Sequence, residues 1–275
     1  RSNSIRDAAN FSSRGPTDDG RIGLTVMAVG THVQGPASTS PNYDGKGVCD
    51  KYWPDGQTDY ARSSGTSHSS PVACGAAMIV HDFFGGVLSA EGHTANPSPA
   101  LLRAVLANTA TDMAGGDNAR GGTITPAPSA DQGWGAVNLS NLTNTKIGQI
   151  HALYSFDQQH TFTGSGQVWE QPILPVDLNR PLKITLVWID APAVPLAAST
   201  LVNDLDLIVT GGGQVWRGNN FSEGQSTPGG QADRINNIES VTIAQPAGVY
   251  TIRVEAHNIA GDGVPGSGGL ADQDF

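Results

Sequence analysis

The stretch Gly65-Thr66-Ser67-His68-Ser69-Ser70-Pro71-Val72-Ala73-Cys74-Gly75 decides how the first half of the chain is interpreted. Gly65 permits a backbone turn that is closed to residues with a Cβ, and Pro71 lacks an N–H, which costs nothing in a first helical turn. Residues 72–80 are small and apolar on every side, which predicts a helix that is buried all round. Ser67 would precede this helix, beside free backbone N–H groups that suit a developing oxyanion.

The stretch resembles the serine box of the subtilisin-like proteases, in which Gly-Thr-Ser is followed at fixed spacing by a proline and small residues. It matches that box at every fixed position. The resemblance implies that Ser67 is the nucleophile and that its own N–H is one donor to the oxyanion. Because serine is also favoured as a helix N-cap, a purely structural role for Ser67 is the alternative.

Three further segments resemble the same family. Residues 11–17 read Phe-Ser-Ser-Arg-Gly-Pro-Thr, residues 26–31 read Val-Met-Ala-Val-Gly-Thr, and residues 132–138 read Gln-Gly-Trp-Gly-Ala-Val-Asn. In the family the last of these closes the catalytic domain. We therefore expect residues 1–145 to be the C-terminal part of a subtilisin-like peptidase domain, and residues 146–275 to be a second domain.

The second part of the chain has a different periodicity. Short strand-like runs at 182–188, 205–209, 238–243 and 250–255, with a further strand near Val168, are separated by clusters of Gly, Pro, Asn and Asp. This spacing is typical of a β-sandwich. It resembles the jelly-roll-like C-terminal domain of certain alkaline subtilisin-like proteases, in which a final strand follows the position of Phe275. The predicted fold is a partial three-layer α/β catalytic domain followed by an all-β sandwich.

Three local features complete the expected fold. Residues 34–64 are rich in Ser, Gly, Asp and Tyr, and predict a surface loop that leads back to the serine box. Gly85-Gly86 predicts the end of the first helix. Ser98-Pro99 has the cap-and-first-residue pattern of a second helix. Leu101, Leu102, Val105 and Leu106 then recur at helical spacing.

A serine hydroxyl is a weak nucleophile that needs a histidine base, which is in turn oriented by a carboxylate. In the family the chain order is Asp, His, Ser, and the first two motifs are expected upstream of this segment. We assign none of the seven histidines as the base: His32, His68, His81, His93, His151, His160 and His257. Because removing the histidine of such a triad lowers turnover by about six orders of magnitude, this segment alone is expected to be almost inactive.

The resemblance also implies a structural calcium site in the second domain. By that resemblance the ligands are Asp206, Asn220, Asp233 and Asn236, with Asp204 close by. Asp204 and Asp206 alternate along a strand, so both should project to one side of it. Asp and Asn also form turns and caps without any metal, and that alternative stays open.

Composition limits the possible partners. Lys and Arg total 15 against 25 Asp and Glu, and the formal charge of −10 argues against nucleic acid. The acidity suits a secreted protein, and no apolar run looks long enough to span a bilayer, so no membrane partner is expected. Cys49 and Cys74 form either a disulfide or two thiols.

These features predict a secreted serine endopeptidase that acts on proteins or peptides. Its N-terminal catalytic half would lie in the same chain or in a separate one. The alternative function is a catalytically incomplete binding or structural module with a calcium-binding β-sandwich.

Overall fold

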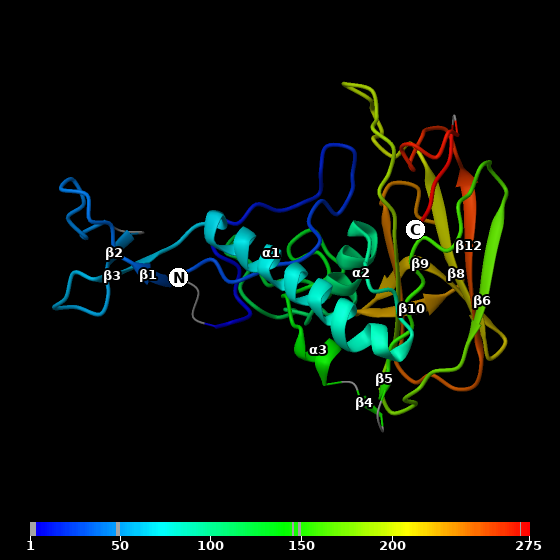
Figure 1. Ribbon diagram of the computed structural model, residues 1–275, viewed down its shortest axis with the longest axis horizontal. Coiled ribbons are helices and arrows are strands. Elements are labelled where there is room, and N and C mark those ends of the chain that lie inside the picture. The colour runs from blue at the N-terminus through cyan, green and yellow to red at the C-terminus, as the bar shows by residue number, and fades with distance from the viewer. Residues whose placement is uncertain (1–3, 48–49, 145, 148–149, 270) are drawn as a thin grey trace.

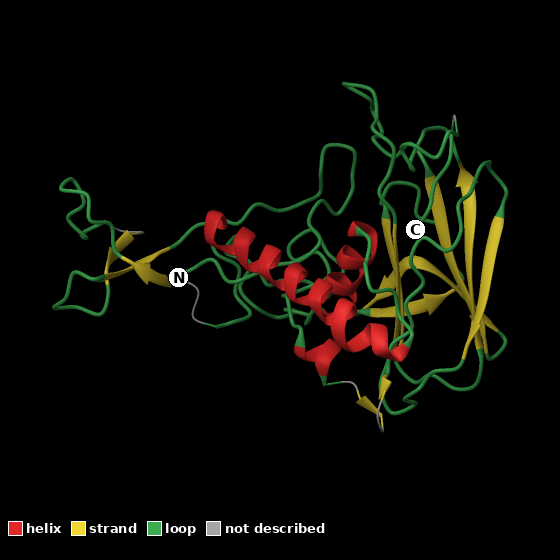
Figure 2. Ribbon diagram, viewed as in Figure 1, coloured by secondary structure: helices red, strands yellow, loops and turns green. Residues whose placement is uncertain are grey.

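The computed structural model describes residues 4–47, 50–144, 146–147, 150–269 and 271–275. Helices and loops make up most of the N-terminal part, and strands make up the C-terminal part (Figures 1 and 2). The helices are α1 (Thr66–Phe83), α2 (Pro99–Thr109) and α3 (Ser140–Thr143). The strands are β1 (Val33–Pro36), β2 (Asp50–Tyr52), β3 (Tyr60–Ser63), β4 (Lys146–Ile147), β5 (Ile150–His151), β6 (Val168–Ile173), β7 (Leu182–Val187), β8 (Asp204–Gly211), β9 (Gln214–Ser222), β10 (Gln225–Pro228), β11 (Ile238–Ile243) and β12 (Tyr250–Asn258).

The first helical segment is longer than the sequence predicted. α1 continues as a π-helical turn, Phe84–Leu88, and a 3-10 turn, Ser89–Glu91, and it ends at Gly92 with φ 93°. The predicted end at Gly85-Gly86 is therefore wrong. Ala76, Val80, Phe84 and Leu88 are buried at intervals of four residues and pack against α2. Because this stripe extends beyond Gly86, the core contacts carry the helical path through both glycines.

The opposite side of α1 corrects a second expectation. Val72 is 41% exposed, Met78 66% and Ile79 57%, so the helix is not buried all round. Among the described residues, no second layer covers this side. Within the helical segment Thr66–Glu91, an 18-residue window has a mean hydropathy of 1.5, and by length and composition alone the segment could cross a membrane. This finding corrects the expectation that no apolar run is long enough to span a bilayer. A helix in the core of a folded domain also has a buried apolar stripe such as the one that packs against α2 here.

The second helix begins where its capping residues predict. The Ser98 hydroxyl accepts a hydrogen bond from the Leu101 N–H at 3.1 Å, and Pro99 is the first helical residue. The pattern works because Pro99 has no N–H to satisfy, while the hydroxyl satisfies one of the free donors of the first turn. Ser98 is itself bound by the Asp157 carboxylate, which ties the start of α2 to the strand-rich part.

Residues 34–64 are more ordered than a loop. They contain a three-stranded antiparallel sheet in the order β1-β3-β2, which extends away from the rest of the molecule (Figure 1). Among the described residues of the range 4–144, this is the one sheet, and the one parallel bridge joins Met27 to Ala136. The three-layer arrangement predicted for the catalytic domain is therefore not assembled by these residues alone.

Besides a short sheet that pairs β4 with β5, the described residues of the C-terminal part contain two antiparallel sheets. One has five strands in the order β10-β9-β8-β12-β6, and the other pairs β11 with β7. Leu207, Val254 and Ile252 of the first sheet share one buried core with Leu186 and Val241 of the second. The predicted strand runs all form strands, and β9 and β10 were not predicted. The core therefore lies between a five-stranded and a two-stranded sheet.

Direct contacts join the helical and strand-rich parts. The Trp134 indole N–H donates to the Ser240 hydroxyl at 2.9 Å, and the Ile22 N–H donates to the Asn236 side chain at 3.0 Å. Ala100, Ala107 and Ala110, from α2 and its C-terminus, share a buried cluster with Trp134, Val187 and Ile238. The proposed boundary between residues 145 and 146 thus separates two parts that share an apolar interface, and the domain boundary itself stays a prediction.

Candidate active site

Ser67 is the second residue of α1 and is exposed. No hydrogen bond engages its hydroxyl among the described residues. Its N–H is one of the first N–H groups of the helix, which have no acceptor within the helix itself. Pro71 lies inside α1 rather than at its start, so the serine belongs to the helix instead of preceding it. The hydroxyl and the N–H that the chemistry would use are therefore both free in this conformation.

The turn before Ser67 is fixed by a different glycine from the one predicted. Gly65 has φ 165° and ψ 162°, an extended conformation that any residue adopts, and a Cβ there would meet nothing closer than 3.9 Å. A Cβ on Gly30 would instead lie 2.9 Å from the Gly65 carbonyl oxygen and 3.0 Å from the Ser69 hydroxyl. The Gly65 N–H also donates to the Gly30 carbonyl at 2.8 Å. Close approach of the backbone at Gly30 therefore positions the start of α1.

Two of the histidines form hydrogen bonds with side chains other than Ser67. His93 contacts the Ser155 hydroxyl at 2.6 Å, and the buried His151 pairs with Glu91 at 2.9 Å. Burial lowers the pKa of His93, and this effect outweighs the nearby Glu91 charge, which raises it. In the part of the chain that the structure describes, no histidine ring forms a hydrogen bond with Ser67.

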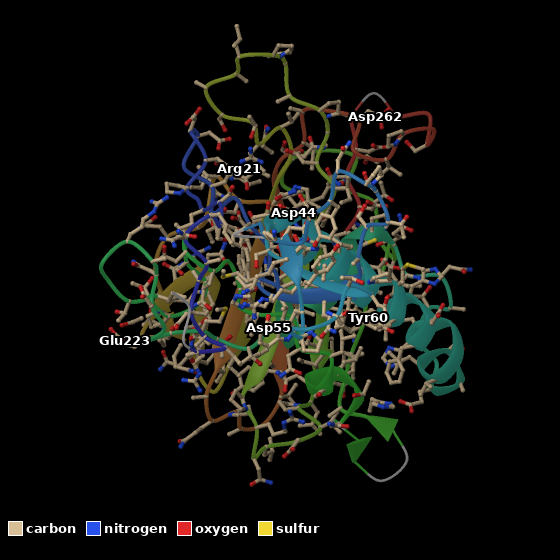
Figure 3. All side chains as sticks on the ribbon, turned by 90° about the vertical axis from the view of Figure 1, so that its left-hand side faces the viewer. Arg21, Asp44, Asp55, Tyr60, Glu223 and Asp262 are labelled. Carbon is tan, nitrogen blue, oxygen red and sulfur yellow. The ribbon has the colours of Figure 1, made fainter. Side chains whose placement is uncertain are left out.

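The sheet that precedes the serine forms one end of the molecule. Figure 3 views the molecule from that end and labels Asp44, Asp55 and Tyr60, which belong to this sheet and its loops. Tyr60 is 50% exposed. β3 leads directly into the serine turn, where the His32 N–H donates to the Ser64 hydroxyl at 2.9 Å. The C-terminal end of β3 therefore connects this exposed sheet directly to the turn before Ser67.

The predicted calcium ligands do not surround one point. Asp204 and Asp206 project to the same side of β8, as predicted, but both carboxylates contact the Arg234 guanidinium. Asp233 accepts hydrogen bonds from Asn219 and Asn236, and Asn220 donates to the Gln231 carbonyl at 2.6 Å. Asn219 and Asn220 lie within β9, not at a strand end.

The arrangement does not fit a calcium ion as it stands. Calcium takes six to eight oxygen ligands around one centre. The Arg234 guanidinium lies where a cation between Asp204 and Asp206 would lie. In the described ranges no group of three His, Cys, Asp or Glu side chains is placed to hold a metal ion. The acids and amides contact one another and Arg234 in this conformation, and the calcium site stays a prediction.

A residue that the sequence did not single out completes this acidic cluster. Glu239 is 1% exposed, and its Oε2 accepts the Leu207 N–H at 2.7 Å, while its Oε1 has no hydrogen-bond partner among the described residues. Burial raises the pKa of Glu239 well above its ordinary value, and the Asp233, Asp206 and Asp204 charges raise it further. Its place in the predicted strand run 238–243, directly after Ile238, is the one sequence signal that could have indicated burial.

The possible disulfide cannot be followed in the structure. Cys49 lies outside the described residues. Cys74 is exposed on α1. The pairing stays a prediction.

Comparison with known proteins places the N-terminal part in a family. Residues 2–135 match the sequence model of the subtilase family. The resemblance drawn from the serine box is therefore confirmed over this range, which includes Ser67 and the segment 11–17. Over residues 2–135 the chain is therefore similar to the sequences of a protease family.

Curated relatives extend the similarity beyond that range. The chain is 29% identical over 273 residues to the "Serine protease/ABC transporter B family protein tagA" of Dictyostelium discoideum, with 90% of this chain covered. It is 26% identical over 288 residues to the protein tagB of the same family and organism, with 85% covered. The chain spans 14% of the length of each of these two relatives. The similarity thus reaches into the strand-rich part but concerns a small share of the relatives.

Proposed function

We propose that this chain is the nucleophile-bearing part of a subtilisin-type serine endopeptidase, in which Ser67 attacks the scissile carbonyl of a protein or peptide. The observation that carries the proposal is the exposed Ser67 at the first turn of α1, with its hydroxyl and N–H free, inside a segment that matches the subtilase family. An upstream histidine, oriented by an aspartate, would take the hydroxyl proton and return it to the leaving amine. The Ser67 N–H would donate to the oxyanion.

The triad Asp and His are proposed to lie in a preceding catalytic segment of the same or a separate polypeptide. The exposed side of α1 supports this, because Val72, Met78 and Ile79 form apolar surface that such a segment would cover. We further propose that the strand-rich part is a jelly-roll-like β-sandwich attached to the catalytic domain, and that the protein acts outside the cell. The two sheets that share one core support the first of these statements.

The test is hydrolysis of a peptide substrate by the protein that includes the upstream segment, with and without Ser67→Ala. We expect this variant to lose about six orders of magnitude in turnover. Ser70→Ala is the matched control, because Ser70 is also exposed in the first turns of α1 and should leave turnover within a few-fold of the original. Unchanged hydrolysis by Ser67→Ala would show that another group is the nucleophile.

A second function is supported by a specific observation. In the described residues no histidine ring forms a hydrogen bond with Ser67, so the chain by itself could serve as a catalytically incomplete binding or structural module. Reaction of Ser67 with a fluorophosphonate distinguishes the two functions. Labelling in the presence of the upstream segment supports the protease, and no labelling under any condition supports the module.

A further inference from the structure

The loop between β7 and β8 presents apolar side chains to solvent. Residues 191–199 read Ala-Pro-Ala-Val-Pro-Leu-Ala-Ala-Ser and contain no charged side chain. Val194 is 74% exposed, and Leu196 is fully exposed. The loop projects from the strand-rich part and is the yellow-green segment at the top of Figure 1. Its tip therefore offers large apolar side chains to any molecule that binds there.

The backbone of this loop has few hydrogen bonds. Among the described residues, those from 192 to 199 form one backbone hydrogen bond, from the Ala197 N–H to the Val194 carbonyl at 3.2 Å. The two prolines of the loop have no N–H to donate. Leu196 has a φ of 65°, in the left-handed region that residues with a Cβ rarely adopt. Because so few contacts hold these residues, their backbone can change conformation without disturbing the rest of the fold.

The two ends of the loop are held in place by hydrogen bonds. The Asp190 carboxylate accepts the N–H groups of Val202 and Asn203, each at 2.8 Å. The N–H and the hydroxyl of Thr200 donate to the Asp19 carboxylate at 3.2 and 2.5 Å. The loop is therefore a closed excursion whose ends stay fixed when its tip moves.

An endopeptidase that cuts a folded protein requires such a loop. The enzyme binds residues on both sides of the cut in an extended conformation, and exposed loop tips are where this can happen without unfolding. Leu196 would fill an apolar pocket before the cut, and Ala197 and Ala198 would follow it with small side chains. Rotation of Leu196 out of the left-handed region also relieves its backbone strain. The bond after Val194 is a poorer candidate, because it leads to a proline, which has no N–H for the enzyme to bind.

Another exposed leucine shows that exposure alone does not make such a site. Leu178 is 54% exposed in the connection between β6 and β7. The Asn179 N–H belongs to the bond that would be cut after Leu178, and it donates to the Asp177 carboxylate at 2.9 Å. This turn is short and has a hydrogen bond at the bond in question, whereas the Leu196–Ala197 bond lies in the middle of a long loop.

The contacts around the loop would keep the two products of a cut together. Trp188, before the loop, donates its indole N–H to the carbonyl of Asn203, after the loop, at 2.9 Å. Leu186 of β7 shares one buried core with Leu207 of β8 and Val254 of β12. Because this core is built from both sides of the loop, hydrolysis of one peptide bond in the loop removes none of its contacts.

We propose that the loop 191–199 is a site of limited proteolysis, at which an endopeptidase that accepts a large apolar residue before the cut hydrolyses the Leu196–Ala197 bond. Water supplies a hydroxyl to the Leu196 carbonyl carbon, which becomes a carboxylate, and the Ala197 nitrogen leaves as an amine that takes the proton. The product is a two-fragment molecule that keeps the fold. The site does not depend on the proposed role of Ser67.

The test is limited digestion of the whole chain with chymotrypsin, which cuts after leucine and aromatic residues. We expect the first cut after Leu196, identified from the masses of the two fragments. Leu196→Gly removes the side chain that fills the pocket of the enzyme and tolerates the positive φ, so this bond should be cut at least about tenfold more slowly. Leu178→Gly is the matched control and should be cut after Leu196 at the original rate.

Two further measurements separate cleavage of the folded chain from cleavage after unfolding. The rate of the first cut should stay constant at low urea concentrations, because the loop opens without unfolding the core, whereas cleavage of the unfolded chain would accelerate steeply. The cut protein should elute as one particle in gel filtration and give two fragments in denaturing electrophoresis. A first cut elsewhere, an unchanged rate for Leu196→Gly, a rate that rises steeply with urea, or fragments that separate without denaturant would overturn the proposal.

Discussion

Asp204 carries a carboxylate that the fold buries without fully pairing it. The residue is 7% exposed; Oδ2 contacts the Arg234 guanidinium at 3.2 Å, and Oδ1 has no hydrogen-bond partner among the described residues. Burial raises the pKa of Asp204 from 3.8 to about 6. Arg234 opposes this change, and the neighbouring Asp206 adds to it. The Asp204 carboxyl therefore binds its proton more tightly in the folded chain than in the unfolded chain.

The difference between the folded and the unfolded pKa of Asp204 gives the contribution of its protonation to the free energy of unfolding, which is about 3 kcal/mol. Because the folded state binds the proton more tightly, this stabilisation is fully present below the unfolded pKa of 3.8 and is lost as the pH rises through about 6. Asp204→Asn keeps the shape and removes the titration. The free energy of unfolding of the original chain, relative to this variant, should fall by up to about 3 kcal/mol between about pH 4 and about pH 7.5.

Urea unfolding followed by tryptophan fluorescence at a series of pH values measures this difference. The comparison with the variant matters because burial raises the pKa of Glu239 too, and that group titrates in both proteins. Asp55→Asn removes one carboxylate at an exposed loop position and is the matched control. A difference between the original chain and Asp204→Asn that stays constant, or that grows in favour of the original as the pH rises, would refute the reasoning.

Three further changes test the description of the fold and of the acidic cluster. Asn203 is fully buried, and its amide bonds Gly261, Asp272, Gln273 and the Ala260 N–H, so Asn203→Ala should cost at least about 3 kcal/mol in urea unfolding. A loss below about 1 kcal/mol would mean that the network forms without it. Gly30→Ala should cost about 1–3 kcal/mol in thermal unfolding, because the new Cβ would meet the Gly65 carbonyl oxygen; an unchanged Tm would contradict the close approach. Excess EDTA should leave Tm unchanged, because calcium would have to displace Arg234 from Asp206, and a fall in Tm would establish a bound metal.

The sequence predicted the elements whose signals are local. The capping pair Ser98-Pro99 fixed the start of α2, because the residues that stabilise a helix start lie within one turn of it. The apolar runs at 182–188 and 250–255 became β7 and β12, because a strand that is buried on at least one face shows it in its own composition. Resemblance found the family over residues 2–135.

The features that the sequence could not predict depend on distant contacts. Gly85-Gly86 did not end the first helix, because burying Phe84 and Leu88 against α2 outweighs the cost of two helical glycines. β9 was missed because Asn219 and Asn220 have turn-forming side chains, and Asn219 keeps a positive φ of 59° within the strand. The ion pairs of Asp204 and Asp206 with Arg234 could not be predicted from the sequence either, since Arg234 lies about thirty residues away.

The contacts across the proposed domain boundary have a consequence for how the molecule unfolds. Trp134 and the alanines of α2 lose their apolar partners if β7 and β11 separate. Asn236 and the β11 residue Ser240 lose their hydrogen bonds to the helical part at the same time. Neither part can unfold without exposing the core surface of the other. Calorimetry should therefore record a single heat-absorption peak. Residues 1–145, produced alone, should be partly unfolded and prone to aggregation instead of folding independently.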